Sequence, residues 1–229
     1  MISFYSGTPG SGKSLHLASR LYWWLKMGKP AIGNFALATD KIKHKGGVDY
    51  TCLSNNELTP AYLQAYAQKK MTERGGVKEG SILLVIDECQ LLFNSRDWNA
   101  KGRNDWLAFY TLHRHLGYDI VLVAQFDRMI DRQIRSLIEY EYIHRKVSNY
   151  GWKGKIFSLL AFGNLFVCVK VWYPMKERVG SEFFRMKKKY YGLYDTFVMF
   201  PKLDACAQDG GPKGGPAEVR TPESATSPT

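Results

Sequence analysis

The feature that most restricts the fold of this chain is an eight-residue segment near its start. The segment fits the pattern G-x-x-x-x-G-K-[ST] at every fixed position. Glycines in such a loop let the backbone curl, so that successive N–H groups point inward and form a concave site for anions. A helix that begins at the end of the loop adds its positive N-terminal end. The segment consists of Gly7, Thr8, Pro9, Gly10, Ser11, Gly12, Lys13 and Ser14.

The residues on either side of this segment have the pattern that a phosphate-binding loop requires. Residues 2–6 alternate in polarity and are rich in aromatic side chains, which predicts a strand. Residues 15–27 carry apolar side chains at helical spacing, and a glycine and a proline follow as stop signals. We therefore expect Lys13 to bind the β- and γ-phosphates of a nucleotide and Ser14 to ligate Mg²⁺.

A second segment predicts where water is activated. Residues 81–86 form a continuous apolar run, as expected of a parallel strand that is buried on both faces. Asp87 and Glu88 follow directly, at the end of the strand where α/β proteins bind their ligands. We expect Asp87 to hold Mg²⁺, directly or through water, and Glu88 to polarise an attacking water. The alternative is that the two acids only cap the strand.

Two further groups extend the predicted site. Another apolar run ends at Gln125, which could bind the γ-phosphate or the attacking water, or could be an ordinary strand-end glutamine. Arg128, Arg132 and Arg135 follow at helical spacing, on a predicted helix over residues 129–137. Arg132 or Arg135 could reach the site of a neighbouring subunit as an arginine finger. A solvated stripe of arginines is the alternative.

The remaining segments alternate between strand and helix patterns. Strands are predicted over residues 31–39 and 48–53, and helices over residues 60–73 and 103–116. Such alternation is typical of an α/β domain with a mainly parallel central sheet.

The C-terminal part has a different pattern. Residues 155–161 and 165–173 predict a β-hairpin, within a hairpin-rich part over residues 139–200. A membrane span is disfavoured, because polar residues interrupt the apolar run and β-branched residues are frequent in it. We therefore expect one domain over residues 1–200, followed over residues 201–229 by a disordered tail or linker that is rich in Gly, Pro, Ser and Thr.

The net charge of +11 indicates an anionic partner, such as a nucleotide, a nucleic acid or an acidic membrane face. A generic basic surface is the alternative. Residues 185–191 combine basic and aromatic side chains, which suit single-stranded nucleic acid or anionic lipid heads, although a solvated face has the same composition.

Taken together, these motifs resemble those of the zonula occludens toxin family, the group of filamentous-phage assembly ATPases. The phosphate loop and the I-D-E-C-Q strand end are shared by many P-loop ATPases. The more specific part is the run H-R-H-L-G-Y-D-I-V-L-V-A-Q, from His113 to Gln125. The resemblance covers residues 1–200.

The resemblance implies an α/β P-loop NTPase of the additional-strand, DNA-pumping-motor type, with a C-terminal β-hairpin region. It implies an ATPase that binds ATP and Mg²⁺ and forms a homo-oligomeric ring in the host cytoplasm, at the cytoplasmic face of the inner membrane. Such a ring extrudes single-stranded phage DNA during virion export, while phage coat or assembly proteins are added. Family members usually carry a transmembrane helix after this domain. Roles carry over onto Lys13, Ser14, Asp87, Glu88 and Gln125.

Two other functions remain open at this point. One is a nucleotide-dependent scaffold or switch for assembly, without motor activity. The other is a small-molecule kinase, against which Glu88 argues, because transfer to an acceptor needs no base for water.

Overall fold

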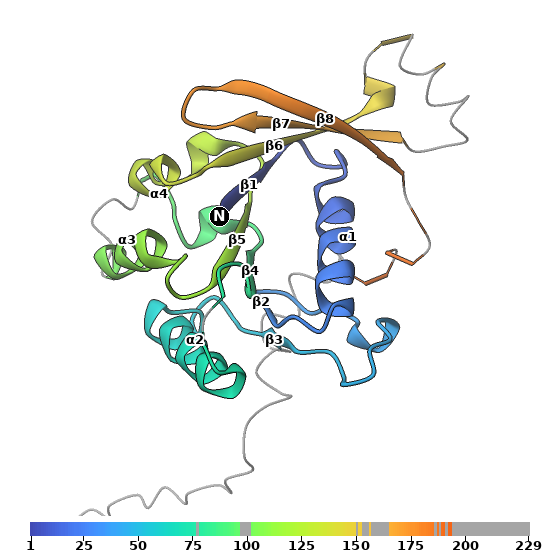
Figure 1. Cartoon of the computed structure of the whole chain (residues 1–229). Coiled ribbons are helices and arrows are strands. Elements are labelled where there is room, and N and C mark those ends of the chain that lie inside the picture. The colour runs from blue at the N-terminus through green and yellow to red at the C-terminus, as the bar shows by residue number, and fades with distance from the viewer. Residues whose placement is uncertain are drawn as a thin grey trace, which may run out of the picture.

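An eight-stranded sheet forms the centre of the computed structural model (Figure 1). The structure describes residues 1–76, 78–96, 102–149, 151–152, 156, 165–185, 187, 189–190 and 192–193 of the 229-residue chain. The strands are β1 (Ile2–Ser6), β2 (Ala31–Gly33), β3 (Tyr50–Cys52), β4 (Ile82–Ile86), β5 (Tyr118–Val123), β6 (Tyr140–Lys146), β7 (Leu165–Trp172) and β8 (Glu177–Arg185). The helices are α1 (Lys13–Lys26), α2 (Pro60–Arg74), α3 (Arg103–Leu112) and α4 (Arg132–Ser136), and short 3-10 turns lie between several elements.

The order of the strands is β3-β2-β4-β5-β1-β6-β7-β8. The first six strands in this order run parallel, and β7 and β8 are antiparallel to their neighbours. β5 pairs with both β1 and β4, so one additional strand separates the strand of the phosphate loop from the strand of the acid pair. The predicted α/β fold with a mainly parallel, additional-strand sheet is confirmed.

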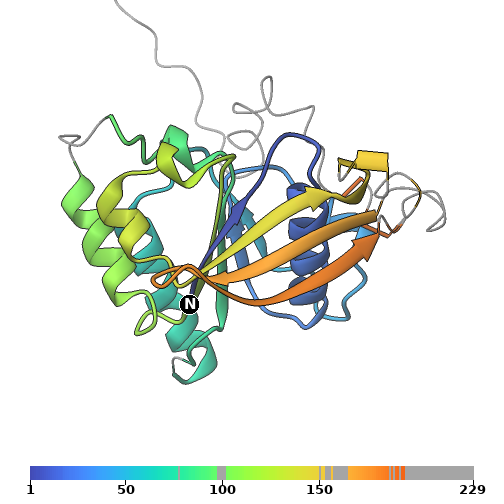
Figure 2. The same cartoon turned by 90° about the horizontal axis from the view of Figure 1, so that it is seen from above.

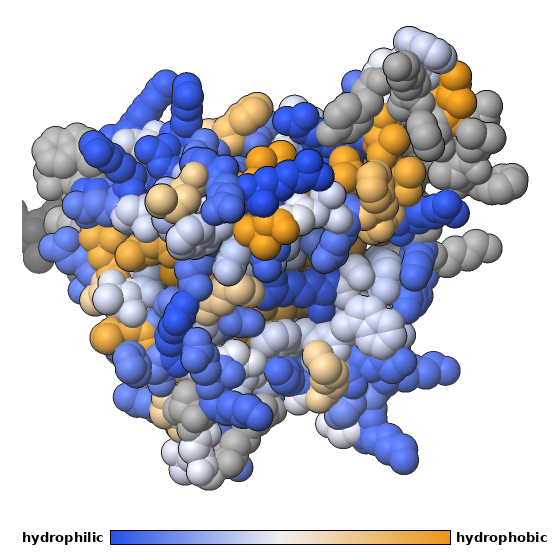
Figure 3. All heavy atoms as spheres, turned by 45° about the horizontal axis from the view of Figure 1, so that its top comes forward, coloured by the Kyte–Doolittle hydropathy of each residue, from blue (hydrophilic) through white to orange (hydrophobic). Residues whose placement is uncertain are grey.

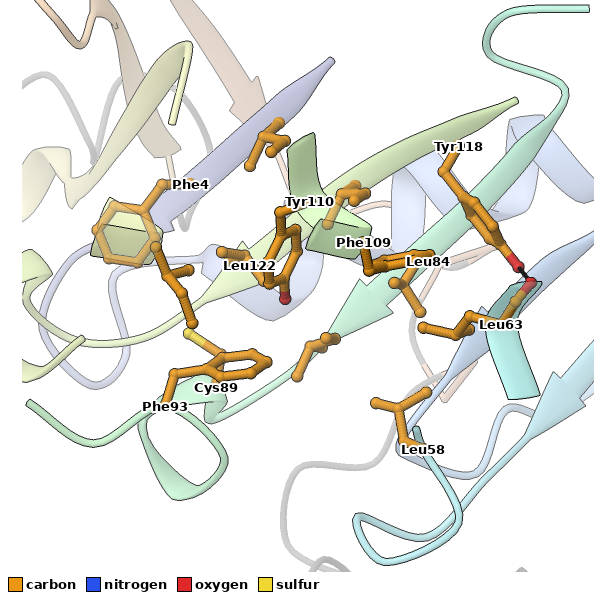
Figure 4. Close-up of a cluster of buried hydrophobic side chains, with 14 of the residues drawn as sticks. Phe4, Leu58, Leu63, Leu84, Cys89, Phe93, Phe109, Tyr110, Tyr118 and Leu122 are labelled. Atoms are coloured by element: carbon orange, nitrogen blue, oxygen red, sulfur yellow. Dashed lines mark hydrogen bonds between the residues drawn. The ribbon is translucent and has the colours of Figure 1, made fainter. Parts of the chain in front are cut away.

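Helices cover both faces of the parallel part of the sheet. α1 lies on one face, and α2, α3 and α4 lie on the other (Figures 1 and 2). Between the sheet and the three helices, Phe4 and Leu122 of the strands pack with Phe109 and Tyr110 of α3 (Figure 4). Burying each of these large side chains stabilises the fold by about 2 kcal/mol. All five residues of β4 are buried, which explains the continuous apolar pattern of this strand.

The hairpin differs from the prediction. β7 lies between β6 and β8, so its hairpin partner is the following segment and not residues 155–161, which apart from residue 156 lie outside the described residues. The turn between β7 and β8 contains Lys176 at φ 54, and its N–H donates to the Tyr173 carbonyl. β8 was not predicted, because nearly every residue of it is exposed and it lacks an alternating apolar pattern.

Several other predicted elements are shorter in the structure. The helix expected over residues 103–116 ends at Leu112, and the strand expected over residues 48–53 is Tyr50–Cys52. The strand expected over residues 31–39 ends at Gly33, because Asn34 leaves the sheet to bond with the backbone of Asp87. The helix expected over residues 129–137 contains only the five residues of α4, which Asp131 caps by accepting from two backbone N–H groups. Arg128 belongs to a separate 3-10 turn and is therefore not on the same helix as Arg132.

The surface of the sheet's antiparallel side is mixed. The face shown in Figure 3 is mostly hydrophilic, with small separate hydrophobic groups. Exposed apolar side chains near this edge of the sheet are Trp172, Met175, Val179 and Phe183. Among the residues that the structure describes, no helix combines the length and the apolar character needed to cross a bilayer. The predicted tail, residues 201–229, lies outside the described part.

Candidate active site

The phosphate loop leads from the end of β1 into α1, as its sequence requires. Gly7, Gly10 and Gly12 have φ angles of 139°, 73° and 95°, which L side chains rarely adopt. At two of these positions a larger residue would also clash with neighbouring atoms. A Cβ atom on Gly7 would lie 2.5 Å from the His144 carbonyl oxygen, and one on Gly12 would lie 2.7 Å from the Phe166 ring. The loop conformation thus depends on β6 and β7 as well as on its own sequence.

Two side chains of the loop are placed to meet an anion. Lys13 Nζ donates to the carbonyl oxygens of Gly7 and Thr8, at 2.6 and 3.3 Å. Burial lowers the pKa of Lys13, while Glu88 and Asp87 act in the opposite direction. The Ser11 hydroxyl is buried and has no hydrogen-bond partner among the described residues. A phosphate oxygen would give the Ser11 hydroxyl a partner and would accept from the third N–H of Lys13, so this loop suits a phosphate ester.

The acid pair lies at the end of β4, on the same edge of the sheet as the loop. Asp87 is buried, and its Oδ1 accepts the backbone N–H of Glu88 at 2.8 Å. β4, β5 and β1 run parallel, so Asp87 follows β4 at the same edge of the sheet where the loop follows β1. Asp87 and Ser14, at the first turn of α1, offer the oxygen donors that Mg²⁺ prefers. The donor set of Ser14 and Asp87 thus suits Mg²⁺ in its chemistry.

The sequence pattern did not reveal two residues that hold the acid pair. Asn34 Oδ1 accepts the N–H of Asp87 at 2.8 Å, and Asn34 Nδ2 donates to the Asp87 carbonyl at 2.9 Å. Gln90 Nε2 donates a short hydrogen bond to Glu88 Oε2. Glu88 itself adopts a left-handed backbone, with φ 47° and ψ 45°. Strain of this kind in a residue other than glycine is concentrated at functional sites.

Gln125 lies next to the phosphate loop. Its carbonyl oxygen accepts the N–H of Gly7 at 3.1 Å, so the end of β5 is tied directly to the first residue of the loop. Gln125 is half-buried, and it follows β5, the strand between β1 and β4. The structure thereby brings together the loop, Asp87, Glu88 and Gln125, which are far apart in the sequence.

The arginines are placed differently. Arg132 is exposed on α4, and Arg135 is half-buried and donates to the Asp127 carbonyl at 3.5 Å. α4 lies on the face of the sheet opposite α1 (Figure 2). Arg114 of the family-specific run is bound within its own chain, since it pairs with Glu139 at 2.6 Å. Arg132 is thus the more accessible of the two candidate fingers.

A family model described as "Zonular occludens toxin (Zot)" matches residues 1–198. The chain belongs to the Zot family. The "Gene 1 protein" of Salmonella phage IKe is 30% identical to it over 207 residues, which cover 85% of this chain and 56% of that protein. The chain thus spans about half the length of this curated relative. The specific run from His113 to Gln125 led to the right family.

Two solved structures resemble this Zot-family chain. The N-terminal domain of zonular occludens toxin from Neisseria meningitidis has a TM-score of 0.53 and 20% identity, covering 85% of this chain and 98% of that one. A second solved structure, an ATPase domain, has a TM-score of 0.54 and 8% identity, with 82% of each chain covered. At these identities the likeness concerns the fold, which is that of a P-loop NTPase.

Proposed function

We propose that this Zot-family protein is an ATP-hydrolysing motor for filamentous-phage assembly, which drives single-stranded DNA out of the host during virion export. The observation that carries the proposal is the acid pair at the end of β4. The strand of Asp87 and Glu88 is separated from the strand of the phosphate loop by β5 alone, and Gln125 follows β5 at the same edge of the sheet. This arrangement suits hydrolysis, because it provides a base for water as well as a site for the nucleotide.

Each residue has a defined part in the proposed reaction. The loop N–H groups and Lys13 bind the β- and γ-phosphates of ATP. Ser14 and Asp87 hold Mg²⁺, which neutralises charge on these phosphates when it is bound. Glu88 accepts a proton from the attacking water, and Gln125 orients that water against the γ-phosphate. Gln90 fixes the Glu88 carboxylate through their hydrogen bond.

This proposal is tested by measuring the release of inorganic phosphate from ATP in the presence of Mg²⁺, with no phosphate acceptor added. Glu88→Gln should retain ATP binding and lose at least about 100-fold in turnover, because only the base is removed. Lys13→Ala should lose binding and turnover together. Glu73→Gln, which changes an exposed glutamate of α2, is the matched control and should behave as the wild type.

The outcome separates the three candidate functions. A wild-type rate that Glu88→Gln does not lower would contradict the motor. If Glu88→Gln also supported phage release, the scaffold or switch would be the better explanation. Transfer of phosphate to a nucleoside monophosphate, with no release to water, would indicate a kinase.

The proposed place of action is the cytoplasmic face of the host inner membrane, where coat or assembly proteins join the DNA. Support comes from the family and from the phage that encodes the curated relative.

The basic and aromatic segment over residues 185–191 is the proposed contact with DNA. Lys187 and Lys189 of this segment are exposed. We expect the double alanine variant to bind single-stranded DNA more weakly and to lower the salt dependence by roughly 1.4 in log–log slope. The same change at Lys43 and Lys45, also exposed, is the control.

A further inference from the structure

A second group of reactive side chains lies behind the phosphate loop, outside the proposed active site. His144 of β6 pairs with Cys168 of β7, and Cys168 pairs with Glu182 of β8. Residues paired across neighbouring strands lie on the same face of a sheet, so these three side chains form one row. His16 of α1 joins the row, because its ring lies 5.1 Å from that of His144, measured between centroids.

The donor atoms of this group converge. One ligand atom each from His16, His144 and Cys168 lies within 4.8 Å of the other two. Within the described ranges of the chain, it is the one group of three or more His, Cys, Asp or Glu residues close enough to hold a metal ion. Nitrogen and sulfur are the donors that Zn²⁺ prefers, whereas Mg²⁺ prefers oxygen. The group therefore differs in chemistry from the predicted magnesium site.

The histidines are already oriented as metal ligands. His144 Nδ1 lies 3.1 Å from the Ser6 carbonyl oxygen. Because a carbonyl only accepts, this nitrogen carries the proton and Nε2 keeps its lone pair. That lone pair faces His16 Nδ1 at 2.8 Å. A carbonyl that fixes the far nitrogen of an imidazole is the usual second partner of a metal-bound histidine.

The surroundings keep both imidazoles in their binding form. Tyr5 stacks on His16, and Phe184 packs against both histidines. Burial disfavours the charged form of an imidazole and lowers the pKa of His144 to about 3, so His144 is neutral at pH 7. Burial raises the pKa of Cys168 to about 12, and a metal ion would have to displace this proton.

We propose that His16, His144 and Cys168 form a binding site for a divalent transition-metal ion of the Zn²⁺ type. Binding forms two metal–nitrogen bonds and one metal–sulfur bond, and the thiol proton is released to solvent. His16 moves its ring proton from Nδ1 to Nε2, so that Nδ1 binds the ion. Bond lengths of about 2.0 Å to nitrogen and 2.3 Å to sulfur require small rotations of the three side chains. A water completes four-fold coordination.

Such an ion would join the phosphate-loop helix to the antiparallel part of the sheet. His16 lies on the first turns of α1, whereas His144 and Cys168 lie on β6 and β7. The ion would thus fix the start of α1 in a way that is independent of ATP, and its role would be structural. We expect it to raise the melting temperature, since it binds the folded chain in preference to the unfolded one.

Titration of the chelator-treated full chain with Zn²⁺ or Co²⁺ alone tests the site. We expect one equivalent to bind, with release of a proton and with a thiolate charge-transfer band for Co²⁺. Cys168→Ser should abolish the band and lower the affinity at least about tenfold. Cys89→Ser changes the other buried free cysteine and should keep both.

A second pair of variants controls for loss of binding that is caused by misfolding. His16→Gln should weaken binding, whereas His44→Gln, which alters a histidine bonded to the Lys26 carbonyl at 3.2 Å, should not. Circular dichroism of the metal-free variants checks that each is folded. The proposal is overturned if the wild type binds less than one equivalent, or if the Co²⁺ spectrum lacks the thiolate band. This spectrum needs no variant, so the test stands even if Cys168→Ser does not fold.

Discussion

Glu88 combines the predicted catalytic carboxylate with a left-handed backbone. This conformation costs a residue other than glycine about 1–2 kcal/mol, and glycine avoids that cost. We predict that Glu88→Gly raises the free energy of unfolding by about 1 kcal/mol and abolishes ATP hydrolysis. Urea denaturation and phosphate release measure the two effects. Glu88→Gln is the control for backbone strain, since it should abolish hydrolysis without stabilising the chain.

Asn34 holds the backbone of Asp87 through two hydrogen bonds across 53 residues of sequence. Asn34→Ala leaves the buried N–H and carbonyl of Asp87 without these partners. We predict a loss of about 1–3 kcal/mol in the free energy of unfolding, together with slower ATP hydrolysis. Asn55→Ala is the matched control, because it removes only the 2.9 Å bond between the two asparagine side chains. Equal losses in the two variants would contradict a specific role for the Asp87 contact.

The contrast between Lys13 and Asn34 shows what could be predicted for single residues. The phosphate loop and the acid pair are contiguous segments, so their chemistry is visible in the sequence. Asn34 acts on Asp87 through a tertiary contact that no local pattern encodes. Gln90 is only two residues from Glu88, but their hydrogen bond depends on the left-handed backbone of Glu88, which the sequence does not show. The roles given to Glu88, Gln125, Arg132 and Arg135 stay predictions until they are measured.

At the scale of elements, Glu139 joins three segments at the edge of the sheet opposite the active site. Its carboxylate accepts from the Ile2 N–H at 3.0 Å and from Arg114 at 2.6 Å. Burial alone would raise the pKa of Glu139, but these hydrogen bonds outweigh it, and the pKa lies below its ordinary value of 4.5. A lowered pKa stabilises the fold above the unfolded value, and this stabilisation is lost as the pH falls through the folded value.

We therefore predict that Glu139→Gln lowers the free energy of unfolding by about 1 kcal/mol at pH 7, and that the difference from the wild type shrinks below pH 4.5. Denaturation at a series of pH values measures this. Glu79→Gln affects a weaker, 3.5 Å contact with Arg114 and should change stability less. A difference that stays constant down to pH 3 would show that the charge of Glu139 does not matter.

Strands with a strong apolar pattern could be predicted from the sequence. Strands that are defined mainly by contacts with the rest of the fold could not. β4 and β5 lie in the buried centre of the sheet, where apolar runs are required on both faces. β8 is an exposed edge strand with few residues to bury, so its sequence carries little signal. β2 is cut short by a contact of Asn34, which depends on the fold as a whole.

At the scale of the whole molecule, we predict that the active site is completed by a neighbouring subunit. If Arg132 is the finger, Arg132→Ala and Lys13→Ala chains should each be inactive alone. Mixed rings should regain roughly a quarter of the wild-type rate, because intact arginines of one variant face intact loops of the other. Phosphate release from the mixture measures this, and mixing Arg128→Ala with Lys13→Ala is the matched control. Failure to regain activity would assign the arginine to its own chain or to no role.

The hydrogen bonds of Lys13 have a consequence for how fast and how selectively a nucleotide can enter. Its ammonium group already rests on two carbonyl oxygens of its own loop. An incoming phosphate would compete with these two carbonyl oxygens for the three N–H donors of the ammonium group. Small anions that reach only one oxygen-binding position gain little from such an exchange, whereas a polyphosphate chain replaces every partner at once. We therefore expect the loop to bind polyphosphates in preference to small anions.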